Sequence, residues 1–146
     1  MKNLVTVLLI TIATGFSSAH AGENPTAERE FARKFIGAEN VHWTNLNDGY
    51  SKVSFTLNGI RAESYYNQDA ELIGTLRNLF YNQLPFPVMQ SLSHRFADAI
   101  VIEITEISNF DGTSYKLTIE KGEKKYSLKL DNQGFILDQQ KITTIK

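Results

Sequence analysis

Side chains that commonly do chemistry are sparse in this sequence of 146 residues, which contains three histidines and no cysteine. The lack of cysteine excludes thiol catalysis, disulfides and Cys-ligated metals. After the N-terminal segment only His42 and His94 remain, and neither belongs to the set of three or four convergent ligands that a metal site needs. We therefore expect both histidines at the surface, with no metal and no cofactor.

A hydrolase would need a nucleophile, a base and a group that orients the base. The sequence has no G-x-S-x-G elbow, and the adjacent Ser93 and His94 would point apart on a helix. Glu103 and Glu106 could suggest paired acids, but three residues apart on a strand they face opposite sides, which favours solubilising or edge-strand charges. We predict no catalytic residue, so the protein is not expected to be an enzyme.

The dipeptides Asp48-Gly49 and Asp111-Gly112 could suggest calcium loops. No loop offers the alternating oxygen ligands of a calcium site, whereas Asp-Gly is common turn chemistry because glycine accepts positive φ. We interpret both dipeptides as turns.

Aromatic side chains give the one positive indication of function. Aromatic residues on strands and loops often anchor protein interfaces, although tyrosines in sheets also pack across strands. The candidates for contact with a protein partner are Trp43, Tyr50, Tyr65 and Phe110.

Tyr50 and Tyr65 lie in a predicted β-hairpin over residues 48–66, the segment around which the rest of the chain is organised. Apolar and polar side chains alternate over residues 52–57, and Asn58-Gly59 then provides a two-residue type I′ turn. This turn places Leu57 opposite Ile60 and Phe55 opposite Ala62. Arg61, Glu63 and Tyr65 are then expected on the solvent side together with Lys52, Ser54 and Thr56.

A looser copy of this hairpin lies about 62 residues later, over residues 111–130, with its turn near Lys121-Gly122. Before each hairpin we predict one helix and one strand. The first helix has Asn24 or Thr26 as its cap and Phe31 and Phe35 on its apolar stripe, and the second starts at residues 84–87 and carries Leu92 and Phe96. The strand before the second hairpin is expected to place Ile100, Ile102 and Ile104 on one face.

The predicted fold class is therefore α+β, with two tandem α-β4 units over residues 24–80 and 84–146. Strands joined by tight turns are antiparallel neighbours, so we expect one antiparallel sheet of about eight strands with two helices packed on one face. The opposite face is expected to be broad and polar.

Residues 1–21 have the pattern of a secretory signal peptide: a basic Lys2, an apolar stretch and an Ala-His-Ala cleavage site. The apolar stretch is roughly half of the ~20 residues that span a bilayer, so we expect no membrane association after cleavage. Because the chain has no cysteine for lipid attachment, we expect a soluble periplasmic or secreted domain over residues 22–146. A net charge of −1 argues against nucleic acid as a partner.

Several residues together resemble the PepSY-like, β-lactamase-inhibitor-like family of exported bacterial proteins. They are the helix end at Lys34-Phe35, the strand of Trp43, the turn Asp48-Gly49-Tyr50 followed by SKVSFTLNG, the turn over residues 66–71, and the second start at Leu84-Pro85. The resemblance implies a tandem αβ unit with a concave sheet surface, as in inhibitors that grip a β-lactamase. It transfers no target-contact residue to this chain.

Two hypotheses for the function follow. The first is a non-enzymatic exported binding module that holds a protein or peptide through the polar sheet face and hairpin loops, in one version as a hydrolase inhibitor. The alternative is a carrier for a small apolar ligand, which needs a cavity of roughly 300 Å³ or more between helices and sheet.

Overall fold

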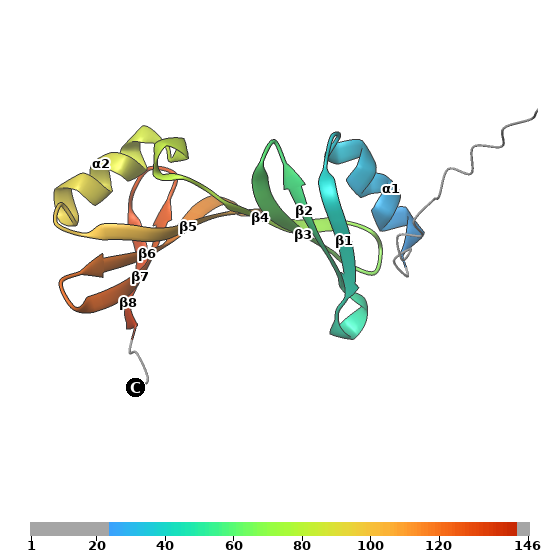
Figure 1. Cartoon of the computed structure of the whole chain (residues 1–146). Coiled ribbons are helices and arrows are strands. Elements are labelled where there is room, and N and C mark those ends of the chain that lie inside the picture. Colours follow the sequence, from blue (N-terminus) through green and yellow to red (C-terminus); the bar gives the residue numbers. More distant parts are fainter. Residues whose placement is uncertain (1–23, 143–146) are drawn as a thin grey trace, which may run out of the picture.

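The computed structural model describes residues 24–142, which form one eight-stranded antiparallel sheet with two helices on one of its faces (Figure 1). The predicted signal peptide lies outside the described residues. In order along the chain the elements are α1 (Pro25–Lys34), β1 (Glu39–Asn45), β2 (Ser51–Leu57), β3 (Ile60–Tyr66), β4 (Leu72–Asn78), α2 (Phe86–Arg95), β5 (Ile100–Asn109), β6 (Gly112–Lys121), β7 (Lys124–Asp131) and β8 (Ile136–Ile142). Short 3₁₀ turns precede β2 (Asn47–Gly49) and α2 (Tyr81–Gln83).

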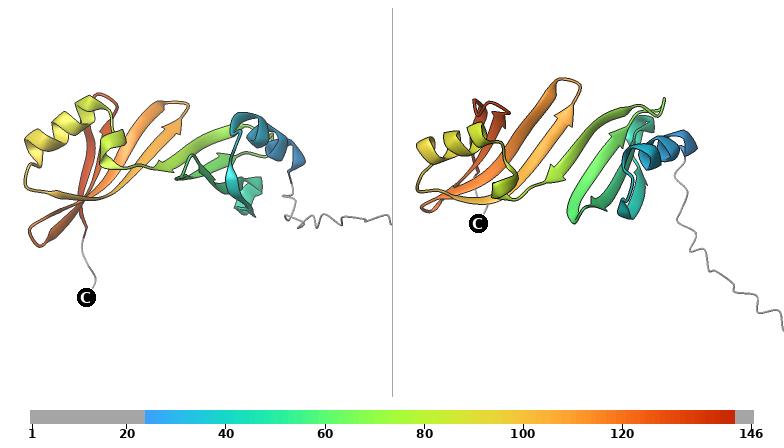
Figure 2. Two further views of the ribbon diagram at one scale, coloured as in Figure 1. Left: turned by 45° about the horizontal axis from the view of Figure 1, so that its top comes forward. Right: turned by 90° about the horizontal axis from the view of Figure 1, so that it is seen from above.

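The strands follow one another across the sheet in chain order from β1 to β8, each antiparallel to its neighbours. The predicted fold class is thus confirmed. Both helices lie on the side of the sheet that faces the viewer in the right-hand view of Figure 2. The strands β4 and β5 join the half that carries α1 to the half that carries α2 (Figure 1).

The first hairpin has the register that the sequence predicts. Leu57 pairs with Ile60 and Phe55 pairs with Ala62. Asn58 and Gly59 have φ values of 51° and 78°, as a type I′ turn requires. The local turn chemistry therefore decides which side chains face the helices.

Each helix covers its own buried cluster. Asn24 caps α1 by accepting a hydrogen bond from the backbone N–H of Ala27 (3.1 Å), and Ala27 and Phe31 are buried against β2 and β3. In the second half Val88 and Leu92 of α2 are buried. The first cluster consists of Ala27, Phe31, Val53, Phe55, Ala62, Tyr66 and Ala70, and the second of Leu84, Val88, Leu92, Ile104, Tyr115, Leu117, Ile119, Leu128 and Leu130.

One expectation about β5 was wrong. Ile100, Ile102 and Ile104 do not share a face, because a bulge between Val101 and Glu103 shifts the register. Ile104 is buried, whereas Ile100 and Ile102 are 67% and 50% exposed, and Val101 packs against the second cluster in their place. Strand β1 has an irregularity at the corresponding place, between Glu39 and His42.

Candidate functional site

The sheet face opposite the helices, which we call the open face, carries the candidate site. Neighbouring side chains alternate between the two faces of a sheet, so the pairing of the strands determines which residues belong to it. No helix of the described residues lies on this face. In the first half and at the junction its members include His42, Thr44, Lys52, Ser54, Thr56, Arg61, Glu63, Tyr65, Leu76, Asn78, Thr105 and Ile107.

Glu63 is the centre of a hydrogen-bonded network on the open face. The hydroxyl of Tyr65 donates to Glu63 Oε2 (2.9 Å), and the hydroxyl of Ser54 donates to Oε1 (3.3 Å). The ammonium group of Lys52 lies 3.4 Å from the same Oε1. The network joins β2 to β3 and holds the Tyr65 side chain in place, so its ring is positioned before any partner arrives.

The network alters the pKa values of its members. Partial burial by itself would raise the pKa of Glu63, but the hydrogen bond from Tyr65 and the positive charge of Lys52 outweigh it, so the pKa lies below its usual value. Burial, together with the hydrogen bond to Glu63, raises the pKa of Tyr65. At neutral pH the site therefore presents a carboxylate that accepts hydrogen bonds from a neutral phenol.

A depression of about 380 Å³ lies next to this network. Glu63, Arg61 and Ser54 contribute polar walls, and Leu76 contributes an apolar one. Asn40 also lines it, at a left-handed φ of 52° within the irregular start of β1. The site thus combines a hollow, an apolar patch and charges of both signs, a mixture that suits a polypeptide surface.

Of the four residues that the sequence suggested for contact, Tyr65 alone lies on the open face. Trp43 pairs with Val53 and faces the helices. Its ring lies 5.7 Å from that of Phe31 and 5.6 Å from that of Tyr66, so it packs against the first cluster.

Tyr50 and Phe110 lie in separate places. Tyr50 follows the 3₁₀ turn before β2, is 43% exposed, and lines a different hollow with Gln68. Phe110 is 82% exposed at the turn between β5 and β6. The structure does not bring the four aromatic residues together.

Sequence reasoning missed Leu76, Asn78 and Thr105, because they reach the site only through the pairing of β3 with β4 and of β4 with β5. The predicted hairpin register had already placed Lys52, Ser54 and Glu63 beside Tyr65. The missing information was the long-range pairing of strands.

An apolar pocket of about 450 Å³ lies on the helix side, at the C-terminal end of α2. The residues that line it are Tyr81, Leu92, Ser93, Phe96, Ala97, Ala99, Val101 and Ile119. In the first half the rings of Phe31, Phe35 and Phe55 occupy the space beneath α1, with centroids 4.8 to 5.2 Å apart. The second half has Leu92 where the predicted repeat has Phe31, which leaves more room.

No three His, Asp or Glu side chains within residues 24–142 are grouped as metal ligands would be. His42 and His94 are both exposed, on β1 and α2 respectively. In the same part of the chain, no helix is long and apolar enough to cross a membrane.

Comparison with known proteins shows a shared fold. No family model matches the sequence, and no curated protein does. The solved structures that match include a BLIP-like protein from Bacteroides fragilis (TM-score 0.74, 18% identity, covering 87% of this chain and 92% of that one). A protein assigned to the periplasm of Bacteroides eggerthii (TM-score 0.73, 19% identity, 84% and 91%) and a DUF2874 family protein from Bacteroides ovatus (TM-score 0.72, 20% identity, 83% and 89%) also match.

This chain has the fold of BLIP-like and DUF2874 proteins. At these sequence identities the comparison supports a shared architecture and does not assign a function.

Proposed function

We propose that this protein is a non-enzymatic exported binding module that holds a protein or peptide on its open face, with the hairpin loops as secondary contacts. The observation that carries the proposal is the Glu63 network beside the 380 Å³ depression. Tyrosines already fixed by hydrogen bonds lose little conformational entropy on binding, which favours their use as anchors.

Export to the periplasm or to the medium is part of this proposal. The pattern of residues 1–21 and the assignment of a structural neighbour to the periplasm both support it. Mass spectrometry of the protein recovered from its source organism tests the processing, because cleavage after Ala21 leaves Gly22 as the first residue. A chain that retains residues 1–21 and stays in the cytoplasm would contradict it.

Affinity capture tests the binding face. The wild-type protein, immobilised and exposed to a periplasmic extract, is expected to retain a defined partner, and the variants Tyr65→Ala and Glu63→Ala are expected to lose it. His94→Ala is the matched control, because His94 is exposed on the helix side. Equal capture by all four proteins, or capture by none, would remove the open face from the proposal.

Inhibition of a hydrolase is a narrower version of the same proposal. The BLIP-like name of a structural neighbour motivates it, and it applies if the captured partner hydrolyses a substrate. The partner's activity is then measured with increasing amounts of the wild-type protein and of Tyr65→Ala. Inhibition by the wild-type protein alone supports this version, and full activity in both series ends it.

The apolar pocket at the end of α2 supports the second candidate function, a carrier for a small apolar ligand. Its volume of about 450 Å³ lies within the range of small-molecule sites, and apolar groups form much of its wall. An environment-sensitive apolar dye is expected to bind the wild-type protein and to be excluded by Ala97→Phe, which fills the pocket. Equal dye fluorescence in both proteins would count against the carrier.

A further inference from the structure

A third feature, remote from the open face, is the hydroxyl of Tyr66. This side chain is 1% exposed, and its oxygen has no hydrogen-bond partner within the described residues. Its ring packs beside Trp43, at 5.6 Å between centroids. Nearly all buried polar atoms in folded proteins are paired, so an unpaired hydroxyl needs an explanation.

The fold itself does not require this hydroxyl. After β3, Asn67 accepts hydrogen bonds from the backbone N–H groups of Asp69 and Glu71 (3.0 and 2.9 Å). At the end of β7, Asp131 accepts the equivalent two bonds from the backbone N–H groups of Gln133 and Phe135 (both 2.9 Å). A shift in register precedes both turns, at Tyr65/Tyr66 and at Lys129/Leu130.

These matching turns give Tyr66 the same place in the first half that Leu130 has in the second. Leu130 is fully buried and completes the second cluster without a polar group. An apolar side chain is therefore sufficient to fill this place in the core, and the hydroxyl of Tyr66 is not needed for packing.

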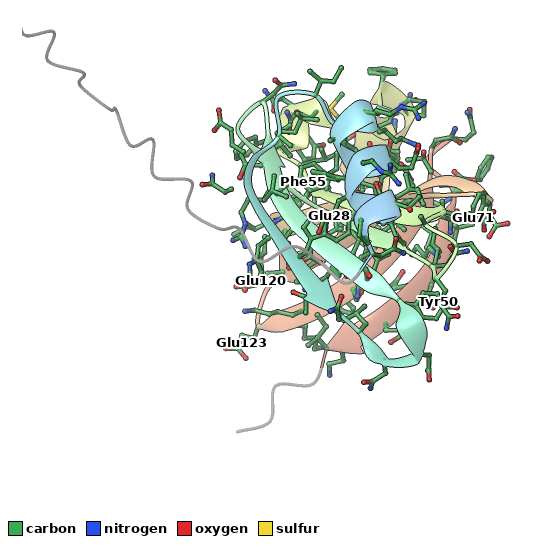
Figure 3. The ribbon with its side chains drawn as sticks, turned by 90° about the vertical axis from the view of Figure 1, so that its right-hand side faces the viewer. Glu28, Tyr50, Phe55, Glu71, Glu120 and Glu123 are labelled. Atoms are coloured by element: carbon green, nitrogen blue, oxygen red, sulfur yellow. The ribbon has the colours of Figure 1, made fainter. Side chains whose placement is uncertain are left out.

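Tyr66 lines a groove of about 580 Å³ between α1 and the turn that leads into β4. One wall of the groove is a face of α1, formed by Thr26, Glu30, Arg33 and Lys34. The opposite wall is formed by Asp69, Ala70, Glu71 and Leu72. Figure 3 shows Glu71 beside α1, on the side of the helix away from β1. The groove is therefore polar, and Tyr66 contributes a buried part of its wall.

The charges of the groove favour a positively charged group next to Tyr66. Arg33 is already paired with Glu30 (3.0 Å), and the three carboxylates outnumber the two basic groups. Burial and then the negative charge of Glu30 raise the pKa of Tyr66 to about 12, so the hydroxyl is neutral and a carboxylate acts on it. Lys34 makes no ion pair within residues 24–142 and can receive a negative group.

We propose that this groove binds the α-ammonium group of an amino acid or of the first residue of a short peptide, between the Tyr66 hydroxyl oxygen and the Glu30 carboxylate. The ammonium group has three N–H donors, which these two oxygens and a carboxylate of the turn can accept. The carboxylate of an amino acid, or the following peptide bond, then lies toward Lys34. A ligand that has a carboxylate but no ammonium group would bring its negative charge next to the carboxylates of the groove without a compensating positive charge.

The test uses NMR amide shifts of the turn over residues 67–71 and four probes at millimolar concentration: L-alanine, trialanine, N-acetyl-alanine and propionate. The first two carry the α-ammonium group and are expected to shift these amides saturably, whereas the last two lack it and are expected to leave them unmoved. Binding of trialanine alone assigns the site to peptides, and binding of both assigns it to the α-amino group in general. Equal shifts with N-acetyl-alanine, or no shifts with any probe, would overturn the proposal.

Substitutions test whether Tyr66 and Glu30 bind the ligand or only contribute to the packing of the fold. Tyr66→Phe keeps the ring and is expected to weaken binding about tenfold, the change that corresponds to one hydrogen bond of about 1.4 kcal/mol. Glu30→Gln is expected to weaken it at least as much. Tyr115→Phe, which removes the hydroxyl of a buried tyrosine in the other half, is the control and is expected to bind normally. Unchanged affinity in both Tyr66→Phe and Glu30→Gln would contradict the site.

Discussion

Arg77 of β4 and Glu106 of β5 form an ion pair across the junction of the two halves, with Nη2 and Nε of Arg77 2.7 and 2.8 Å from Glu106 Oε1. Their backbones are directly opposite in the sheet. The same row of paired residues continues to Phe55 and Ala62 on one side and to Tyr115 and Leu130 on the other, so the pair lies between the two buried clusters.

The substitution Glu106→Ala is expected to lower the free energy of unfolding by about 1–3 kcal/mol. Glu106 is 14% exposed and Arg77 43%, so the pair is shielded on one side and its loss leaves a cation without its partner. Denaturant unfolding measures the change, and a double-mutant cycle with Arg77→Ala isolates the pair.

The control for this pair is Glu120→Ala, which removes an exposed ion pair with Lys125 at 3.7 Å. Exposed pairs contribute about 0–1 kcal/mol, so this variant is expected to unfold almost as the wild type does. Equal effects of the two substitutions would show that the junction pair does not stabilise the contact between the halves.

Each buried cluster can be probed with one substitution. Phe55→Ala is expected to cost about 3–5 kcal/mol and Leu117→Ala about 2–5 kcal/mol, because both side chains lie on the buried face in the middle of a strand. Figure 3 shows Phe55 beside α1. Denaturant midpoints that hardly change in either variant would be incompatible with this packing.

Local patterns in the sequence predicted much of this fold, because local chemistry decides those parts. Asn58-Gly59 fixed the register of the first hairpin, and with it the solvent side of Tyr65 and Glu63. The helix stripes at Phe31 and Leu92 were likewise confirmed.

Features that depend on irregular or distant pairing were not predictable. Glu106 was interpreted as a solubilising or edge-strand charge, but β5 is a central strand and Arg77, 29 residues away, faces it. Trp43 faces inward because it pairs with the buried Val53 in the regular part of β1, and this register is set by the irregular connection through the 3₁₀ turn over Asn47–Gly49. Ile102 in β5 is exposed because it lies at the bulge between Val101 and Glu103, and no local pattern signals where such a bulge lies.

The lowered pKa of Glu63 predicts a dependence of stability on pH. Partial burial opposes the shift, and the hydrogen bonds and the charge of Lys52 produce it, so the folded-state pKa lies below the unfolded value of 4.5. A depressed carboxyl pKa stabilises the fold above the unfolded pKa, and this contribution disappears as the pH falls through the folded pKa.

The matched variant is Glu63→Gln, which cannot ionise. The difference in unfolding free energy between the wild type and Glu63→Gln is expected to be constant at neutral pH and to shrink below about pH 4.5. Denaturant melts at several pH values measure it. A difference that grows as the solution becomes more acidic would have the opposite sign and would reject the assigned network.

The raised pKa of Tyr66 predicts a loss of stability in alkaline solution. The folded protein keeps the phenol proton up to about pH 12, whereas the unfolded chain releases it near 10.0. This contribution to stability is complete below pH 10 and is lost as the pH rises toward 12. In an alkaline titration followed by tyrosinate absorbance, Tyr66→Phe is expected to remove a late component near pH 12. A late component of unchanged size in the variant would assign it to another tyrosine.

Gly134, in the turn between β7 and β8, is expected to tolerate alanine much less than Gly59 does. Both residues have positive φ, 84° and 78°, so alanine brings a similar backbone cost of about 1–2 kcal/mol at either place. At Gly59 an added Cβ would meet no atom within 4 Å, whereas at Gly134 it would lie 2.4 Å from the carbonyl oxygen of Pro87 in α2. Gly134→Ala must therefore displace the helix or the turn, and the second cluster beneath α2 is disturbed with it. Denaturant unfolding of the two variants measures the difference, and equal losses of stability would show that α2 and this turn are not in close contact.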